Sequence, residues 1–592
     1  MWGTPEMRLV IDCETNALRN PTKVHCIVAK DIDDGETYTF VGKECQEEFP
    51  RFIRRGRLFI GHNCIAFDWP ILRKLCGVHT VPEHVFDTLV VSRLLEFTFP
   101  GGHSLDAWGQ RPVIGLGKQG KNITDWSEFT VEMLERCVSD VEINAKLYHH
   151  LTEKARIKYK DVFKNAIQIE HQIAWICQEM HENGFGFDKE KAKNLYEEIS
   201  TKVQEIDREL DTAFPPKVET VQLKRKVKQI VTPFNPGSPK QIVERLEGFW
   251  KPTEKTDSGK SWKISEKNLA TLSPEAPRAA QRLVERLMLA SRLRTLDQWF
   301  DAYNEKTGRV HAEFSGLGAW THRMSHSRPN LGNVAAPKSI KYHGAVLAEL
   351  ATSYGGRMRE LWCVKEYDDD ETPTWLVGCD AEGIQLRIFG HYINDEEFIR
   401  AVVQGKKEDG TDPHSLNARI LECSRDAAKT FIYAFLLGAG DGKIGEILGC
   451  SKRGGAAAKK RFINAIPGLA KLKKEDIPRD AQRGHIVGFD GRLVKVDSEH
   501  KVMAAYLQTG EAVIMKHANV LWREESKRSS LAFRQVNFVH DEWQTELKGT
   551  EEEAHVLGRI QAASIERTGR SFGLRCPMAG NYTIGKNWKE TH

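Results

Sequence analysis

The sequence contains no long hydrophobic run. No uncharged apolar stretch of 18 residues occurs in the 592 residues, and the opening segment MWGTPEMRLVIDCE has no apolar centre of the kind that signal peptides carry. A helix needs about 20 predominantly apolar residues to cross a bilayer. The sequence therefore predicts neither secretion nor a membrane span.

The cysteines form no paired pattern. The 12 cysteines are scattered, without a CxxC pair or the spacing of a zinc site. Disulfide frameworks and structural zinc sites need regular cysteine spacings, whereas isolated cysteines are usual in the reducing cytosol. We therefore expect a cytoplasmic protein with reduced thiols.

A large excess of charge of one sign is also missing. Lys and Arg number 86 against 82 Asp and Glu, and the net charge of +4 is too small to indicate nucleic-acid binding by itself. Any surface that binds nucleic acid must then be local. The chain is too long for one hydrophobic core, so we expect several domains.

Hydrophobic patterns divide the chain into regions of different character. Over about the first 150 residues, β-rich runs such as MRLVIDC, HCIVAK, ETYTFV and RLFIGHN alternate with helical patterns such as DWPILRKLCG and FDTLVVSRLLEF. Long helical stripes follow to about residue 310, interrupted by PPKVETVQLKRKVKQIVTPFNPGSPK, which predicts a basic loop or tip. Beyond Trp375, a strand, a helical region and a strand pair around QVNFVHDEWQTEL predict an α+β region.

Carboxylates stand out near the N-terminus. Asp12 and Glu14 are two apart on an expected strand, so both side chains point to one face. Asp68 and Asp140 each adjoin an apolar run. Four carboxylates at one end of a sheet could hold two Mg²⁺ ions and activate water for phosphodiester hydrolysis. From these residues alone, four ordinary solvated acids remain the alternative.

A cationic helix is expected at RDAAKTFIYAFLLG. Arg425, Lys429 and Tyr433 fall on one narrow helical face, with apolar residues such as Phe431 and Phe435 on the other side. Two cations four residues apart repel one another, and an anionic ligand such as a triphosphate would remove that conflict. A solvated surface helix is the alternative.

Two expected strands carry acidic residues where burial would be costly. Asp380 ends the apolar strand WLVGCD, and Asp541 and Glu542 interrupt VNFVHDEWQTEL. A buried carboxylate needs a metal ion or an ion pair. A pair of Mg²⁺ ions held by Asp380 and Asp541 could activate a primer 3′ hydroxyl and stabilise departing pyrophosphate.

The order of these features is more specific than any one of them. DAEGIQLR, RDAAKTFIYAFLLG and VHDE resemble motifs A, B and C of family A DNA polymerases, most closely those of the replicative polymerases of short-tailed phages. DxE, NxxxFD and the aspartate near residue 140 resemble the proofreading 3′–5′ exonuclease domains of DNA polymerases.

The resemblance implies a multidomain α/β and α+β fold, with an N-terminal ribonuclease H-like exonuclease fold followed by a right-hand polymerase. The implied domains are the exonuclease domain 1–155, the helical thumb region 156–310, the first part of the palm 311–394, the fingers 395–490 and the second part of the palm 491–592.

The resemblance also implies residue roles and two Mg²⁺ ions in each active site. The exonuclease metal ligands would be Asp12, Glu14, Asp68 and Asp140. The polymerase would use Asp380 and Asp541 as metal ligands, with Glu542 as a further catalytic residue. Contacts with the incoming dNTP would come from His414, Arg425, Lys429, Tyr433 and Gln385. Contacts with DNA would come from Arg323, Gln508 and His500.

Some positions depart from the family pattern. Arg136 stands where the exonuclease domains usually have a tyrosine that orients the attacking water. Gln385 replaces a glutamate that restricts the sugar, and Leu437 replaces a tyrosine near the template base. Tyr433, where many bacterial members have phenylalanine, predicts ready incorporation of dideoxynucleotides.

The predicted function is template-directed addition of dNTPs to a primer, with 3′–5′ proofreading, in the replication of phage DNA. The alternatives are a single-subunit RNA polymerase-like enzyme and an exonuclease joined to a non-synthesising DNA-binding module. Expected partners are primer-template DNA and dNTPs, with a phage helicase or primase and a single-stranded DNA-binding protein as further candidates. Thioredoxin is not expected, because only a short segment separates DRELDTAF from TPFNPGS. The expected location is the cytoplasm of a bacterial host.

Overall fold

The computed structural model describes residues 7–54, 58–79, 84–159, 163–223, 226–256, 258–269, 272–334, 354–365 and 372–592. The chain folds into two compact units. The first contains Met1–Asn183, Glu313–His326 and Val377–Thr583, and the second contains Gly184–Ala312, Ser327–Leu376 and Ile584–His592. Within the described ranges, no helix is both long enough and apolar enough to span a bilayer.

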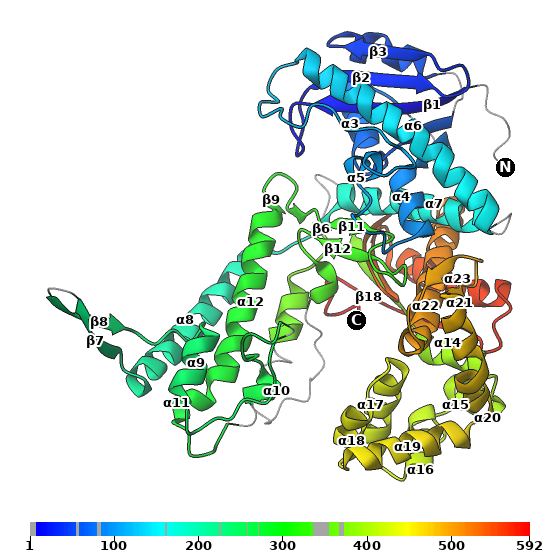
Figure 1. Cartoon of the computed structure of the whole chain (residues 1–592). Helices are drawn as coiled ribbons and strands as arrows, with labels where there is room; N and C mark the ends of the chain where they lie inside the picture. Colours follow the sequence, from blue (N-terminus) through cyan, green and yellow to red (C-terminus); the bar gives the residue numbers. More distant parts are fainter. Residues whose placement is uncertain are drawn as a thin grey trace. The chain divides into compact units, whose positions relative to one another are not determined.

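A five-stranded sheet forms the N-terminal part of the first unit (Figure 1). Its strands lie in the order β3-β2-β1-β4-β5; β1, β2 and β3 are antiparallel, and β4 and β5 run parallel to β1. Their bounds are β1 Arg8–Thr15, β2 Val24–Asp31, β3 Thr37–Val41, β4 Leu58–Gly61 and β5 Val85–Asp87. The first four strands confirm the sequence prediction, whereas β5 lies within a segment that was interpreted as the start of a helix.

Helices cover both faces of this sheet. The alternating side chains of β1 send Val10 into one apolar core, which α6 and α4 complete, and Leu9 and Ile11 into a second core beneath α3. Because Asp12 and Glu14 continue the series of Val10, they lie on the face that α6 crosses. The helices are α1 Glu44–Glu47, α2 Phe49–Phe52, α3 Asp68–Cys76, α4 Thr88–Leu95, α5 Leu105–Gly109, α6 Val131–Tyr159 and α7 Phe163–Asn183.

A four-stranded sheet lies near the C-terminal end of the chain, in the order β16-β17-β13-β18. A hairpin joins β16 to β17 through the two residues His540 and Asp541, and His540 has a positive φ of 53° that such tight turns require. The elements are β13 Thr374–Ala381, β16 Phe533–Val539, β17 Glu542–Lys548 and β18 Gly580–Gly585, with the helices α22 Glu499–Arg528 and α23 Glu551–Ser571. The predicted strands near Asp380 and Asp541 are confirmed.

A group of helices follows β13. Ser424 caps the N-terminus of α17 and Asp412 caps that of α16, each through a side-chain oxygen that accepts backbone N–H bonds. These elements are α14 Ile384–Ile393, α15 Glu396–Gln404, α16 Pro413–Leu421, α17 Arg425–Leu436, α18 Asp441–Leu448, α19 Lys452–Ala465, α20 Pro467–Lys471, the π-helical turn Leu472–Asp476, α21 Ile477–Arg483, β14 His485–Val487 and β15 Leu493–Lys495.

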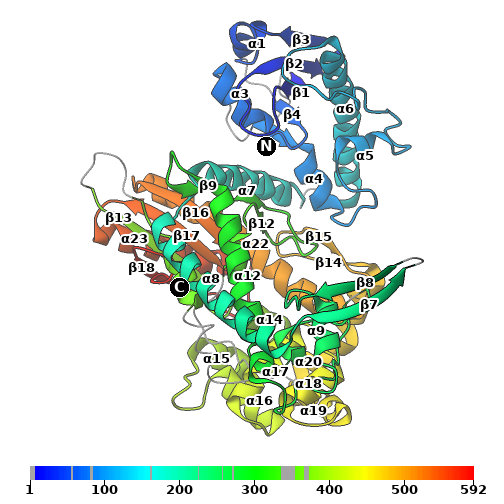
Figure 2. The ribbon, with the colours of Figure 1, turned by 90° about the vertical axis from the view of Figure 1, so that its left-hand side faces the viewer.

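The second unit is built on two long helices, α8 Lys189–Ala213 and α12 Leu283–Ala302, which pack together. Between them, β7 Lys217–Leu223 and β8 Lys226–Thr232 pair as a two-stranded ribbon that extends away from the helices (Figures 1 and 2). The segment predicted as a basic loop or tip forms such a tip as a β-hairpin and not as a loop, because the β-branched residues of VETVQ and VKQIV favour strands. The shorter elements are β6 Phe185–Gly186, α9 Pro239–Arg245, α10 Glu266–Leu269, α11 Arg278–Gln281, β9 Tyr303–Asn304, β10 Arg309–Val310 and the 3-10 turn η3 Leu331–Asn333. The strands β11 Glu313–Ser315 and β12 Ser325–Ser327 pair with each other.

A buried ion network joins α7 to α22 within the first unit. The Glu170 carboxylate accepts hydrogen bonds from Lys516 Nζ at 2.6 and 2.8 Å and from Arg492 Nη1 at 2.6 Å. Arg492 also pairs with Asp490 at 2.7 Å. All four side chains are almost fully buried, so each charge depends on its partners. The helix α7 therefore packs as part of the C-terminal half as well as of the N-terminal sheet.

Candidate active sites

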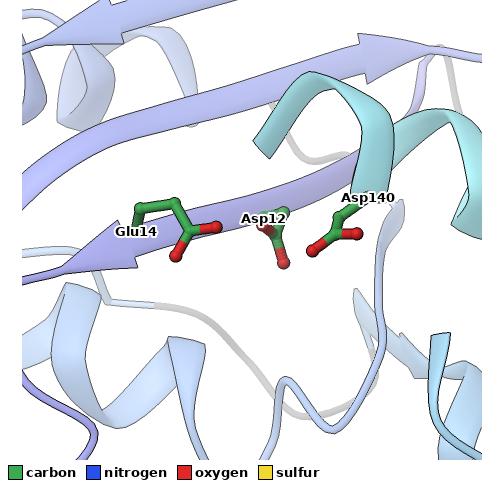
Figure 3. Close-up of side chains that lie close together, drawn as sticks. All are labelled: Asp12, Glu14 and Asp140. Atoms are coloured by element: carbon green, nitrogen blue, oxygen red, sulfur yellow. The ribbon is translucent and has the colours of Figure 1, made fainter. Parts of the chain in front are cut away.

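The N-terminal sheet gathers three carboxylates. Asp12 and Glu14 leave the same face of β1, as their spacing predicts, and α6 carries Asp140 across that face. The nearest ligand oxygens of the three all lie within 4.8 Å of one another, and Figure 3 shows the carboxylates gathered together. Across the described ranges, no second group of three or more Asp, Glu, His or Cys side chains has this spacing.

Asp68, the fourth predicted ligand, lies beside this group. It is the first residue of α3, is buried, and accepts a hydrogen bond from Cys13 Sγ at 3.3 Å. After burial, the charge of Asp68 is the largest cause of the raised pKa of Asp12. The structure thus brings Asp68 close to Asp12 without including it in the group of three.

Burial raises the pKa of all four carboxyls. The pKa of Asp12 lies well above its usual value, that of Asp140 is raised, and those of Glu14 and Asp68 reach about 7. Burial is the largest cause at each, and the Asp12 carboxyl is further affected by its acidic neighbours. Asp140 Oδ1 is buried without a hydrogen-bond partner. Buried carboxyls with a raised pKa and an oxygen left open fit a hard divalent cation.

Two cations already contact this group. Arg136 Nε donates to Glu14 Oε1 at 2.9 Å, and Lys118 Nζ donates to Asp140 Oδ2 at 2.5 Å. The sequence marked Arg136 only as a departure from the family pattern. Lys118 was missed, because it lies in the segment between α5 and α6 and belongs to no motif.

The C-terminal sheet brings Asp380 and Asp541 to neighbouring strand ends. Asp380 lies near the end of β13, Asp541 lies in the turn before β17, and the Ala381 N–H donates to the Asp541 carbonyl oxygen at 3.0 Å. Burial, followed by the charge of Glu511, raises the pKa of Asp541 to about 6. Glu542 is buried on β17, and its Oε1 accepts a hydrogen bond from Gln544 Nε2 at 2.7 Å. A divalent cation beside Asp541 would relieve the repulsion that raises its pKa.

The cationic face of α17 meets α16. Arg425 forms two hydrogen bonds with Asp412, Nε to Oδ1 at 3.1 Å and Nη2 to Oδ2 at 2.7 Å. The rings of His414 and Tyr433 lie 6.1 Å apart, and burial, Arg425 and Lys429 lower the pKa of His414. All four predicted nucleotide-binding residues of this region therefore come together, with Asp412 as a partner that the sequence analysis missed.

The same helix faces the C-terminal sheet at its other end. Burial and, after it, the charge of Asp541 raise the pKa of Tyr433. Phe431 and Phe435 are buried on the opposite side of α17, as predicted. Leu437 is the residue at the C-terminal cap and is 54% exposed, so it has no place in the apolar core.

Comparison with known proteins identifies the family of the chain. A sequence model described as DNA polymerase family A matches residues 208–590, more than half of the chain. The chain belongs to DNA polymerase family A. DNA-directed DNA polymerases of Enterobacteria phage T3 and Escherichia phage T7 are each 27% identical to this polymerase over 99% of this chain and 100% of their own length.

More distant relatives are bacterial. The thermostable DNA polymerase I of Thermus aquaticus is 22% identical over 78% of this polymerase and 52% of its own length. The solved POL domain of Pol1 from M. smegmatis, in complex with DNA primer-template and dNTP, has a TM-score of 0.76 at 17% identity, covering 100% of this polymerase and 96% of that chain. The prediction of a family A polymerase fold is confirmed.

Family membership also confirms the predicted activity. This family A polymerase is a DNA-directed DNA polymerase that carries out template-directed synthesis, and its family uses divalent metal ions. The alternative of an RNA polymerase-like enzyme is not supported. The roles of individual residues and the domain boundaries remain predictions.

Glu511 is a buried carboxylate of this polymerase that the sequence analysis missed. It lies on α22 and accepts hydrogen bonds at Oε2 from Arg323 Nη2 at 2.5 Å and Gln385 Nε2 at 2.8 Å. Its other oxygen, Oε1, is buried without a partner. The sequence signal that could have found it is the same as for Asp380. Glu511 is an acidic residue within the otherwise uncharged run LQTGEAVIM, and burying such a charge without a partner is costly.

The predicted DNA-contact residues of the polymerase occupy different environments. Arg323 is mostly buried by its pairing with Glu511. Gln508 lies on the same helix as Glu511, and its Oε1 accepts a hydrogen bond from Thr321 Oγ1 at 3.2 Å. His500 is exposed in the first turn of α22.

Proposed function

We propose that this polymerase replicates phage DNA and combines synthesis with 3′–5′ proofreading at two separate carboxylate sites. The observation that supports this most directly is the presence of carboxylates at two different sheets. Asp12 and Glu14 on β1 lie close to Asp140 on α6, and Asp380 and Asp541 lie at neighbouring strand ends of the second sheet. The proposed domains are those expected from the sequence, with the exonuclease in 1–155, the thumb in 156–310, the palm in 311–394 and 491–592, and the fingers in 395–490.

Synthesis takes place at the second sheet. Asp380 and Asp541 would hold two Mg²⁺ ions, with Glu542 beside them as a further catalytic residue. When bound, these ions activate the primer 3′ hydroxyl and stabilise the leaving pyrophosphate. His414, Arg425 and Lys429 bind the triphosphate, Tyr433 packs against the sugar, and Gln385 restricts the 2′ position. The pairing of Arg425 with Asp412 orients its guanidinium before a nucleotide arrives.

Proofreading takes place at the first sheet, within a ribonuclease H-like fold. Asp12, Glu14, Asp68 and Asp140 would hold Mg²⁺, which lowers the pKa of a bound water that attacks the terminal phosphodiester. The unpartnered Asp140 Oδ1 and the raised pKa of each carboxyl support this assignment.

DNA and accessory proteins complete the proposal. Arg323, Gln508 and His500 contact the primer-template, and the thumb contacts phosphates without reading sequence. A phage helicase or primase and a single-stranded DNA-binding protein act with the polymerase in the host cytoplasm. Thioredoxin is not required, because only residues 214–233 separate α8 from the FNPGS turn, and β7 and β8 make up most of the described part of this segment.

Extension of a labelled primer on a template tests the proposal. With Mg²⁺ and dNTPs the primer lengthens, and with Mg²⁺ alone it shortens from its 3′ end. Ribonucleotides in place of dNTPs give little extension. Shortening without any extension would leave only an exonuclease on a DNA-binding scaffold, and extension without shortening would remove the proofreading part.

Replacement of Tyr433 by phenylalanine tests the sugar contact. Loss of the hydroxyl on this exposed face of α17 is expected to weaken dideoxynucleotide incorporation by roughly one to two orders of magnitude, since a lost hydrogen bond contributes about 1–3 kcal/mol. The measurement is kcat/KM for ddNTP relative to dNTP in both proteins. An unchanged ratio would contradict the role given to Tyr433.

Replacement of Glu511 by alanine tests its hold on Gln385 and Arg323. We expect kcat/KM for dNTP addition to fall roughly 10- to 100-fold, because hydrogen bonds to a buried charge contribute about 1.5–3 kcal/mol, and we expect discrimination against ribonucleotides to weaken. Glu511→Gln, which keeps the shape and one acceptor, is expected to lose less. Equal kinetics for wild type and Glu511→Ala would show that Gln385 and Arg323 need no such support.

A further inference from the structure

The segment that carries Lys118 is hydrogen-bonded to α6, the helix that carries Asp140. The Gln119 N–H donates to Ser139 Oγ at 3.4 Å, Ser139 Oγ donates to the Gly117 carbonyl at 3.4 Å, and Arg136 Nη1 donates to the Gly120 carbonyl at 3.1 Å. Ser139 precedes Asp140 directly. These bonds hold Lys118 beside the carboxylates before any ligand binds.

Gly120 makes this close approach possible. It has a positive φ of 61°, and a Cβ at this position would lie 2.9 Å from Arg136 Cβ. Any other residue would push the segment away from α6. The side chain of Lys118 is accordingly only 16% exposed and points to Asp140, unlike a solvated surface lysine.

The charges of the site leave room for one divalent ion. Four carboxylates, Asp12, Glu14, Asp68 and Asp140, face two cations, Lys118 and Arg136, so the formal charge is −2. One divalent ion neutralises the −2 of these six groups, whereas two would leave the same groups with a net charge of +2. Positive charges gathered in one site repel one another strongly where water is partly excluded.

The free oxygens agree with this count. Lys118 occupies Asp140 Oδ2, and Arg136 occupies Glu14 Oε1. Asp140 Oδ1 is buried and unpartnered, and one oxygen from each of Asp12, Glu14 and Asp140 lies within 4.8 Å of the other two, so the three carboxylates can share one ion. We propose that the exonuclease site of this polymerase binds one divalent cation, and that Lys118 supplies the positive charge which a second ion would otherwise bring. This inference rests on the proposed exonuclease function.

Counting bound Mn²⁺ tests the proposal. The background is the full chain with Asp380→Asn and Asp541→Asn, which removes the palm ligands, and the count is read from the loss of the free Mn²⁺ signal in electron paramagnetic resonance. Ions at the exonuclease site are those lost when Asp12→Asn and Glu14→Gln are added. We expect one ion in the background, two with Lys118→Met, and one with the charge-preserving Lys118→Arg.

The other outcomes separate two failures. Two ions in the background, or one ion with a folded Lys118→Met, would overturn the role of Lys118 and leave proofreading in place. If adding Asp12→Asn and Glu14→Gln removes no bound ion, the proofreading site itself is overturned. If Lys118→Met does not fold, the count in the background still decides between one ion and two.

Thermal unfolding gives a second readout. In EDTA, Lys118→Met is expected to melt below the background, because Asp140 then loses its counter-charge, and Mn²⁺ is expected to raise its melting temperature by more than it raises that of the background. If Lys118 served only packing, Lys118→Met would lower the melting temperature by the same amount in EDTA and in Mn²⁺, and Mn²⁺ would stabilise the variant no more than it stabilises the background.

Discussion

Primer extension is expected to fall by at least about a thousandfold when Asp541 is replaced by asparagine, while shortening of the primer is expected to continue at the wild-type rate. The substitution keeps the shape of the turn between β16 and β17 and removes one negative charge. Burial and the nearby Glu511 raise the pKa of Asp541 to about 6, so its ionised form depends on a cation for stabilisation. Loss of a metal ligand at a reacting centre costs several kcal/mol, and ~4 kcal/mol corresponds to a thousandfold.

The two activities are measured on the same labelled primer, with and without dNTPs. Glu552→Gln is a matched control, because it removes a carboxylate from an exposed position on α23, where the Glu552 ion pair with Arg559 lies at the surface. It is expected to leave both activities unchanged. Extension that survives in Asp541→Asn would remove Asp541 from the metal ligands, and simultaneous loss of both activities would point to damage to the fold.

Asp12→Asn is expected to have the opposite effect: shortening of the primer should fall by at least about a thousandfold, and extension should be retained. Asp12 contributes an oxygen to the group with Glu14 and Asp140, and an amide is a much poorer ligand for Mg²⁺ than a carboxylate. Because DNA ends that carry a mismatch are then no longer removed, extension from a mismatched primer should also leave the mismatch in the product.

The thermal stability of Asp12→Asn distinguishes loss of a metal ligand from unfolding of the protein. Burial and the neighbouring acids raise the pKa of Asp12, so its ionised form is destabilising at neutral pH when no metal is bound. The asparagine variant should therefore melt no lower than wild type in EDTA. Asp34→Asn, at an exposed turn of the same domain, is the control. Undiminished shortening in Asp12→Asn would contradict the proposed exonuclease site, and a lower melting temperature would contradict the account of its charge.

Local patterns in the sequence predicted most of the elements that carry the sites. The alternation in β1 placed Asp12 and Glu14 on one face, and the helical spacing in α17 placed Arg425, Lys429 and Tyr433 on another. Such periodicities depend on the chain alone, and burial of the apolar side follows from them. The strand β5 was missed because three residues are too few to establish a period.

The partners of these residues could not be predicted in the same way. Lys118, Asp412 and Glu511 each complete a site through a contact between separate elements. A lysine in a glycine-rich segment, or an aspartate before a proline, has the same local pattern whether or not a charge lies opposite. Only the packing of α6, α17 and α22 determines whether such a lysine meets a carboxylate or such an acid meets a guanidinium.

The ion network around Glu170 has a consequence for dissecting the protein. A fragment that began after α7 would retain the four-stranded sheet and the helices that follow β13, yet Lys516 and Arg492 would lose the acid that they share. Lys516 would then remain buried without its ion-pair partner, and Arg492 would keep only Asp490, which is strongly destabilising. A shortened polymerase without its five-stranded N-terminal sheet must therefore still begin before α7, so the chain can be cut only ahead of this helix.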